Sequence, residues 1–329
     1  MTLFSKIELK NQDLHGLNFE HINLSYSDFR GSDFDNAKIT DANFARANLS
    51  DANLLGMDLT GTILTGADLS DANLAGVDLS GMDLTKMKLI GADLSNAVLT
   101  ETIMAGADFR RTNLAGVDLS SWDLTGTILS SADLTNAVLP SDYLSQNDFT
   151  STVFDGVDLS GKDLTGSVFN IVSFKNTNLQ NANLSAADFV QVDFTEIKNK
   201  SLAGADLSHA SFAHSNLIGV SLDNAILKGS NFYNSNLSGQ DFTDISNNLV
   251  SGSLFINAKL SNSDFEGVDL SPQEYITTTF KNKAFAINLE GESFSESIFS
   301  ESVIPIQDYL HVISKEVRGN DLVVSYVLF

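Results

Sequence analysis

The stretch from Ala67 to Gly76 reads ADLSDANLAG, and its two five-residue units decide the fold. Each unit has a small residue, then Asp or Asn, then leucine, then two residues. Working outward from this stretch, a large apolar residue occupies every fifth position from Phe4 to Phe194 without a break. A period of five matches neither the 3.6 residues of a helical turn nor the alternation of an ordinary strand. The sequence is therefore an internal repeat.

The chemistry of one unit predicts a short extended segment followed by a turn. The large central residue and the small residue two positions before it can both face one interior. The Asp or Asn between them must then face outward, and the Ser, Thr, Gly or Asn that follows favours a turn. Stacked coils of such units would share one continuous core. Each buried Leu or Phe would contribute roughly 1.5–3 kcal/mol of transfer free energy.

These A-(D/N)-L-x-x units resemble the repeats of the pentapeptide repeat family, and the resemblance extends over nearly the whole chain. It implies an all-β fold, a right-handed quadrilateral β-helix (a pentapeptide repeat solenoid) with four units per coil. With four units per coil, the repeats of this sequence predict about 15 coils.

The spacing of the large residues also predicts the domain organisation. The solenoid is expected over residues 1–304, with loops near 195–201 and 245–254, where the spacing changes. Residues 305–329 are expected to form a C-terminal helix/strand cap, because an open solenoid end exposes its core and its strand edges. The N-terminus shows no such cap, so its open end is a candidate surface for a homodimer.

Two patterns predict the cap. Pro305 precedes, and Gly319 follows, a segment whose apolar residues have helical spacing, which predicts a helix. The apolar run after it, residues 322–329, predicts a strand. The residues with helical spacing are Ile306, Tyr309, Leu310, Ile313 and Val317.

Composition limits the function. The 329 residues include no Cys and carry a formal net charge of −23. Direct nucleic-acid binding is not expected, because phosphates require a surface rich in Lys and Arg. Neither a signal peptide nor an apolar stretch of membrane-spanning length is visible, so we expect a cytoplasmic protein that does not bind a membrane.

A few residues depart from the repeat and are candidates for partner binding. Met82, Trp122 and Lys162 stand where the repeat has a small inward residue, at intervals of forty residues, and Asp142 lies between the last two. The plainer interpretation is that the corner opens and these side chains lie outside. The alternative is a partner-binding patch anchored by Trp122, the single tryptophan. Two further candidates, Lys198 and Lys200, make the loop at 195–201 basic.

Catalytic chemistry is not predicted. Asp pairs are frequent because Asp belongs to the repeat, and the acids fall on all four faces of the expected coil. The negative charge is therefore interpreted mostly as a by-product of the repeat. No metal site, phosphate-binding loop or nucleophile motif is found, so neither a metal nor a cofactor is expected.

The sequence favours a non-enzymatic scaffold that binds a protein partner along its walls. The resemblance offers a second hypothesis, a DNA-mimicking regulator of a type II topoisomerase that inhibits or protects DNA gyrase. A third hypothesis is a secreted effector of a bacterial pathogen, for which no separate secretion domain is visible. An enzyme is the least favoured class.

Overall fold

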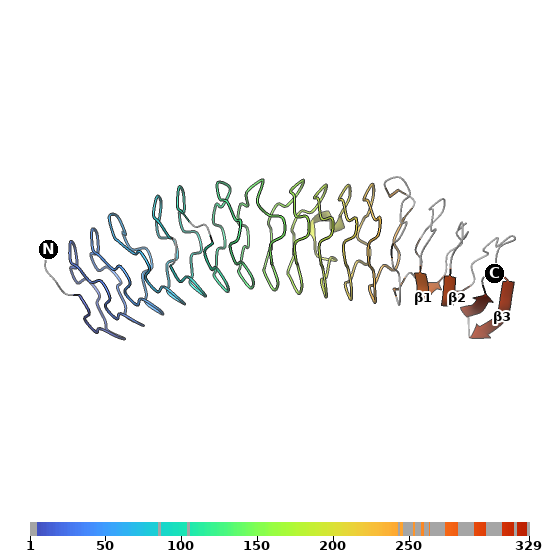
Figure 1. Cartoon of the computed structure of the whole chain (residues 1–329), viewed down its shortest axis with the longest axis horizontal. Helices are drawn as coiled ribbons and strands as arrows, with labels where there is room; N and C mark the ends of the chain where they lie inside the picture. Colours follow the sequence, from blue (N-terminus) through green and yellow to red (C-terminus); the bar gives the residue numbers. More distant parts are fainter. Residues whose placement is uncertain are drawn as a thin grey trace. The chain divides into compact units, whose positions relative to one another are not determined.

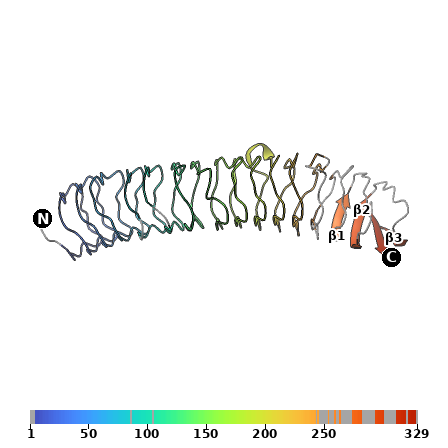
Figure 2. The same ribbon diagram turned by 45° about the horizontal axis from the view of Figure 1, so that its top comes forward.

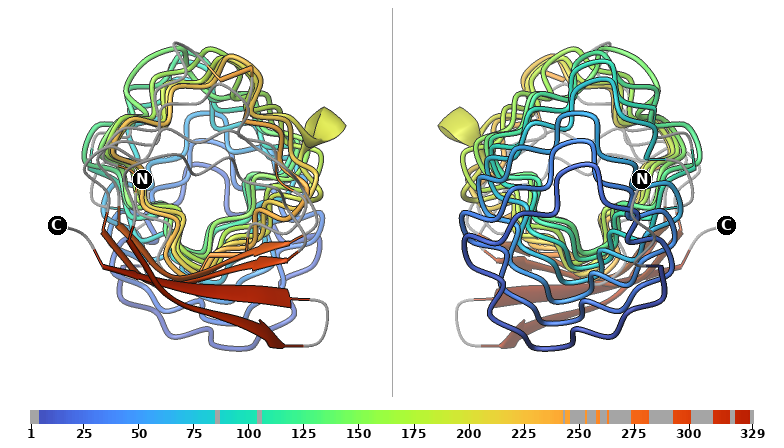
Figure 3. Two further views of the ribbon diagram at one scale, coloured as in Figure 1. Left: turned by 90° about the vertical axis from the view of Figure 1, so that its right-hand side faces the viewer. Right: turned by 90° about the vertical axis from the view of Figure 1, so that its left-hand side faces the viewer.

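The computed structural model describes residues 5–84, 87–103, 106–242, 244–245, 253, 258–259 and 263, together with four strands near the C-terminus. The chain divides into two compact units, Met1–Val157 and Asp158–Phe329, and each is described by itself. Within each unit the repeats follow one another as stacked coils (Figures 1 and 2). Seen end on, the coils trace four-sided loops (Figure 3).

One coil of the first unit consists of twenty residues, or four five-residue units. Parallel bridges join outward residues twenty positions apart, as from Asp33 to Asn53 and from Asn53 to Asn73. The Leu54 amide donates to the Asn73 carbonyl at 2.9 Å, and the Asn73 amide donates to the Ala52 carbonyl at 2.9 Å. Each unit therefore contributes one short rung to a ladder that runs from coil to coil.

The turns explain why the outward residue is Asp or Asn. In a typical unit the Leu17 amide donates to the Leu14 carbonyl at 3.1 Å, and Gly16 between them has a φ of 67°. A positive φ at this place favours Gly, Asn and Asp. The outward residue completes the turn, because Oδ1 of Asp13 accepts the amide of His15 at 3.0 Å. Asn43 does the same for Ala45 at 2.9 Å.

The large central residues fill the interior. In the second unit a column of stacked phenylalanines passes through Phe169, Phe189, Phe212 and Phe232, with ring centroids 5.1, 5.1 and 5.2 Å apart. All four side chains are fully buried. The small residues two positions earlier are buried as well, as Ala187 shows. The five-residue period therefore corresponds to one large and one small core residue per side of each coil.

A short insertion in the second unit makes one local helix. The 3-10 helix η1, Lys198–Lys200, lies where two central residues are eight positions apart. Bridges that cross the insertion join residues 23 apart, as from Asp188 to Ser211, so three extra residues leave the coil. Figure 3 shows η1 outside the outline of the neighbouring coils.

The described C-terminal segments form a four-stranded sheet. Its strands are β1 (Glu274–Lys281), β2 (Ser293–Ser300), β3 (His311–Arg318) and β4 (Asp321–Val327), in the order β1-β2-β4-β3. β1 and β2 pair in parallel, whereas β4 is antiparallel to both β2 and β3.

Strand β3 corrects the prediction of a C-terminal helix. Residues 311–317 were expected to be helical, but they form a strand paired with β4, where Arg318 lies opposite Asp321. The residues between this pair are Gly319 and Asn320, a dipeptide typical of two-residue hairpins. Ile313 and Val317 share a face in a helix and also in a strand, so their spacing could not distinguish the two. β4 overlaps the segment 322–329 that was expected to be a strand and begins one residue before it.

Strands β1 and β2 differ from the expected five-residue rungs. Each is an eight-residue strand, although they pair nineteen to twenty residues apart, about one coil. In β1 the place of a turn is occupied by Thr277, Thr278 and Thr279, which are β-branched and favour extended backbone. Most of the predicted loop at 245–254, the start of the predicted cap and the N-terminal residues 1–4 lie outside the described residues.

Candidate functional site

Trp122 lies inside the coil, which corrects both interpretations of its exposure. Its side chain is 6% exposed, and its Nε1 donates to the Leu99 carbonyl at 3.3 Å. The indole packs on Phe109 with centroids 6.0 Å apart. A tryptophan fits because its ring reaches the core while its one donor finds a carbonyl of another coil. A buried Trp122 cannot serve as the exposed anchor of a partner patch.

Met82 lies beside an opening between two coils of the first unit. It is half-buried and lines a pocket of about 380 Å³ together with Ile63 and Asp83. The pocket is bounded by residues 61–65 of one coil and 80–84 of the next. The predicted departure from a small inward residue therefore coincides with a place where the surface is hollowed.

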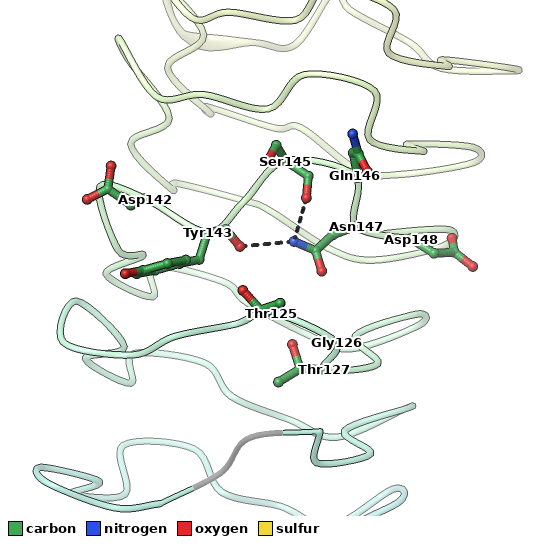
Figure 4. Close-up of a pocket in the computed structure, with 9 residues that line it drawn as sticks. All are labelled: Thr125, Gly126, Thr127, Asp142, Tyr143, Ser145, Gln146, Asn147 and Asp148. Carbon is green, nitrogen blue, oxygen red and sulfur yellow. Dashed lines mark hydrogen bonds between the residues drawn. The ribbon is translucent and has the colours of Figure 1, made fainter.

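Asp142 is exposed at a second and larger opening of the first unit. This pocket has a volume of about 770 Å³ and lies between residues 125–127 and 142–148. Figure 4 shows Asp142 and Asp148 toward opposite ends of the pocket, with Tyr143 between them and Asn147 turned back toward the backbone. The Asn147 amide donates to the carbonyl of Tyr143 at 3.0 Å.

The larger pocket arises from a unit that has lost its turn chemistry. In most units the residue after the centre donates its amide to the outward Asp, as Thr60 does to Asp58 at 2.9 Å. In the unit of Leu139, Pro140 has no amide hydrogen to donate, and the Val138 side chain has no atom to accept it. That turn bond therefore cannot form. The left-handed conformation moves to Tyr143, with a φ of 67°. For a bulky side chain this backbone is strained.

The remaining predicted residues belong to the second unit. Lys162 is half-buried, and its amide donates to the Leu159 carbonyl at 3.2 Å. Lys198 and Lys200 are exposed in η1. Ser160 lowers the pKa of Asp158 most, through its hydroxyl, and Lys198 contributes less. Lys198 and Lys200 therefore belong to a different compact unit from Met82 and Asp142.

The four sides of the first unit are of two kinds. On two sides the bridges continue from every coil to the next, and we call these sides the ladder walls. Their outward residues run from Asp28 to Ile128 and from Asp33 to Val153 at intervals of twenty. On the other two sides the ladders are interrupted: Asp58 and Asp123 form no bridge, and none joins Val98 to Asp118 among the described residues.

The two interrupted sides are consecutive along the chain and form one surface, which we call the mixed wall. Its outward residues between 58 and 143 are all exposed, whereas most outward residues of the ladder walls in this region are half-buried. Half of the mixed-wall residues are acidic, and half are large and apolar. They are Asp58, Ile63, Asp78, Asp83, Val98, Ile103, Asp118, Asp123, Val138 and Tyr143.

Acidic residues of one ladder wall are neutralised by cations of the same chain. Lys88 contacts Asp68 at 2.7 Å, and Arg110 contacts Asp108 at 2.6 Å. The Arg30 guanidinium, together with Lys10, lowers the pKa of Asp28 to about 2. These pairs keep like charges in successive coils from facing each other without a cation between them.

The mixed wall carries less of this compensation, because Asp58, Asp78, Asp118 and Asp123 form no ion pair among the described residues. Its five-residue units between 57 and 146 contain seven acidic side chains and a single base, Lys86. The ladder-wall units between them contain five acids and three bases. Hydrogen bonds from Thr60 and Ser80 hydroxyls lower the pKa of Asp58 and Asp78, respectively. Asp118 and Asp123 have lowered pKa values for the same reason, so the wall is negatively charged at neutral pH.

The apolar half of the mixed wall was missed in the sequence, although a signal was present. Ile63, Val98, Ile103, Val138 and Tyr143 occupy the outward place that the repeat gives to Asp or Asn. Their exposed fractions lie between 45% and 55%. An aliphatic or aromatic residue at a position known to face solvent marks a surface that differs from the rest of the solenoid.

Among the described residues, no cluster of His, Asp and Glu is arranged to hold a metal ion. The same residues include no helix long and apolar enough to span a membrane. His209 lies against Gly229, and His214 packs on Tyr233 with centroids 5.4 Å apart, so the two histidines pack against different residues.

Comparison with known families identifies the repeat. The family model described as pentapeptide repeats matches more than half of the chain, at residues 3–41, 42–81, 78–116, 102–140, 163–196 and 201–244. The chain belongs to the pentapeptide repeat family. Pentapeptide repeat proteins fold as right-handed quadrilateral β-helices, which is the fold of the stacked coils described above. Among curated proteins, no sequence matches this pentapeptide repeat protein.

Solved pentapeptide repeat proteins resemble parts of the chain. HetL, involved in heterocyst differentiation regulation in the cyanobacterium Nostoc sp. Strain PCC 7120, is 25% identical over 79% of this chain and 90% of its own, with a TM-score of 0.23. Full-length QnrB1, a plasmid-mediated fluoroquinolone resistance protein, is 18% identical over 62% of this chain and 92% of its own, with a TM-score of 0.31. A protein from the Arabidopsis thaliana thylakoid lumen is 24% identical over 46% and 68%, with a TM-score of 0.08.

Proposed function

We propose that this pentapeptide repeat protein is a non-enzymatic scaffold that binds a protein partner along the walls of its solenoid. The observation that carries the proposal is the set of large apolar side chains at outward positions of the mixed wall. Exposed apolar residues gathered on one surface are typical of protein interaction sites. The repeating turns present them at regular intervals along this surface.

The polar residues support binding rather than catalysis. Most acidic side chains at outward positions accept backbone amides of their own turns, as Asp118 does from Ser120 at 2.9 Å. Their pKa values, where shifted, are lowered rather than raised, so they are poor proton donors near neutral pH. A scaffold needs this regular, charged surface, whereas a general acid needs a raised pKa.

A DNA-mimicking regulator of a type II topoisomerase is the second candidate, and the negative charge of the mixed wall favours it. Its apolar residues argue against it. Val98 lies beside Asp78 in the ladder, and Ile103 beside Asp83, so carboxylates alternate with aliphatic side chains. A DNA backbone offers phosphates without such apolar neighbours.

Affinity capture with the full chain, after chemical crosslinking in the source cells, tests the scaffold. We expect a protein partner that an unrelated bait of similar negative charge does not retain. Failure to retain any partner above that control would contradict the scaffold. A supercoiling assay with purified gyrase tests the second candidate, for which inhibition or protection at micromolar protein is required.

A further inference from the structure

The mixed wall of the first unit differs from the ladder walls in three independent ways. Its ladders are interrupted, its outward side chains are more exposed, and four of its carboxylates form no ion pair among the described residues, unlike those of Asp28, Asp68 and Asp108. The repeat alone requires none of these differences, because the ladder walls are built from the same units.

The interruptions leave room between coils. The openings of about 380 and 770 Å³ both lie on the mixed wall, the first beside Ile63 and Asp83 and the second beside Tyr143. Where no bridge joins two coils, their rungs are not paired as neighbouring strands. An extended second polypeptide can add hydrogen bonds at such a strand edge.

The charge of the wall selects the partner. Asp58, Asp78, Asp118 and Asp123 have no ion pair among the described residues, and Asp142 extends the acidic series to the larger pocket. Nucleic acid and anionic lipid carry the wrong sign of charge. A second copy of the same wall would also be repelled, because the whole chain has a net charge of −23.

The spacing of acidic and apolar side chains selects the form of that partner. Coils that carry two carboxylates, as at Asp78 and Asp83 or Asp118 and Asp123, alternate with coils that carry two apolar residues, as at Val98 and Ile103. Adjacent rungs are about 4.8 Å apart, so like positions recur at roughly 10 Å along the wall. An extended segment in which cationic and aliphatic side chains alternate can contact both the carboxylates and the apolar side chains of the wall.

We propose that the mixed wall binds an extended segment of a partner protein that is rich in Lys or Arg and in aliphatic side chains. The proposal rests on the proposed scaffold function and names its surface and the chemistry of its partner. Tyr143, which is 54% exposed between two acidic residues, offers a ring face to a cation at the larger pocket.

The test uses four synthetic peptides of equal length that combine either Lys or Glu with either Val or Ser. Binding to the full chain is measured by fluorescence anisotropy at low and at physiological salt. We expect the Lys/Val peptide to bind most tightly, the Lys/Ser peptide more weakly, and both Glu peptides not measurably. The affinity should fall as salt rises, because part of it is electrostatic.

Two double variants test the wall with residues that the repeat already uses. Val98→Asn with Ile103→Asn removes apolar contact, and Asp118→Asn with Asp123→Asn removes charge. The Asn side chain can accept the turn amide, as it does at Asn43, so the coils should be preserved in both variants. Each double variant should lower the affinity for the Lys/Val peptide by about tenfold, because a few contacts are expected to dominate binding.

Matched controls come from the ladder walls. Ile128→Asn replaces an exposed aliphatic residue there, and Asp133→Asn removes a charge there, and neither should change peptide affinity. The inference is overturned if no peptide binds, if a Glu peptide binds as tightly as its Lys counterpart, or if controls and wall variants lose affinity equally. A crosslinked cellular partner that wall variants retain fully would overturn the wall assignment while leaving the scaffold function intact.

Discussion

At the residue scale, Trp122 shows how one large side chain is accommodated in a repeat built for small ones. Most units have Ala, Ser, Thr or Val at this position, yet the indole is buried against Phe109 and bonds to the Leu99 carbonyl. Trp122 therefore belongs to the core of the first unit. Its energetics should follow the rules for buried aromatic residues.

Trp122→Ala should lower the free energy of unfolding of the first unit by about 3–5 kcal/mol, the cost of a large cavity in a packed core. Trp122→Phe should cost less, because most of the apolar contact remains. Urea unfolding followed by circular dichroism measures both changes. The single tryptophan should also fluoresce at short wavelength and resist quenching by acrylamide, and an emission typical of solvated indole would contradict its burial.

Gly61 and Gly56 provide a second comparison at this scale. Both have a positive φ, of 69° and 62°. A methyl group at Gly61 would collide with the carboxylate of Asp41, which contacts His21, whereas one at Gly56 would meet nothing within 4 Å. Replacing either glycine by alanine therefore has the same backbone cost, roughly 1–2 kcal/mol, because an L-residue is strained at a positive φ.

Gly61→Ala should consequently destabilise the first unit more than Gly56→Ala does, by about 1 kcal/mol, the usual size of an exposed contact that must rearrange. Chemical unfolding of the two variants in parallel measures the difference. Equal losses would show that Asp41 moves aside at no cost.

At the element scale, the ion pairs of the ladder wall make its stability depend on pH. The hydrogen bond from Arg30 and a smaller effect of Lys10 lower the pKa of Asp28 from 3.8 to about 2, although burial acts in the opposite direction. A carboxyl group with a depressed folded-state pKa stabilises the fold above its unfolded pKa. That contribution disappears as the pH falls through the folded-state value.

The unfolding midpoint of the first unit should therefore decline between about pH 4 and pH 2, because in this window the unfolded chain binds protons that the folded chain does not. Arg30→Gln should flatten that decline. Its effect at neutral pH should not exceed about 1 kcal/mol, because the pair is partly solvated. Arg46→Gln is the control, since Arg46 bonds to the Tyr26 hydroxyl rather than to a carboxylate.

Prediction from sequence succeeded where one pattern had one structural solution. The Leu and Phe at the unit centres had to be buried, and the outward Asp or Asn had to complete a turn. Prediction failed at β3, where Ile313 and Val317 share a face in a helix and in a strand. Counting Asp by face also missed the mixed wall, because the neutralising cations Lys88 and Arg110 had to be placed first.

At the scale of the whole molecule, the repeat has two periods, twenty residues for the coil and forty for the alternation of the mixed wall. Deletion of residues 96–115 would keep the coils but place Asp78 beside Asp118 and Asp83 beside Asp123. Deletion of residues 76–115 would instead leave Asp58 followed by an acidic coil, as it is now. Like charges about 5 Å apart destabilise a sheet.

The shorter deletion should therefore lower the thermal unfolding midpoint of the first unit more than the longer one, although it removes fewer residues. Circular dichroism should show β structure in both proteins. The prediction fails if the midpoints fall in proportion to the number of residues removed.

This double period constrains how such a gene can change its length. Gain or loss of a single coil preserves the packing of the leucines. It shifts the acidic coils beyond the junction by one coil relative to those before it, so the alternation is broken there. Gain or loss of two coils preserves both. A change in the length of this chain that preserves the alternation of its mixed wall must therefore add or remove coils in pairs.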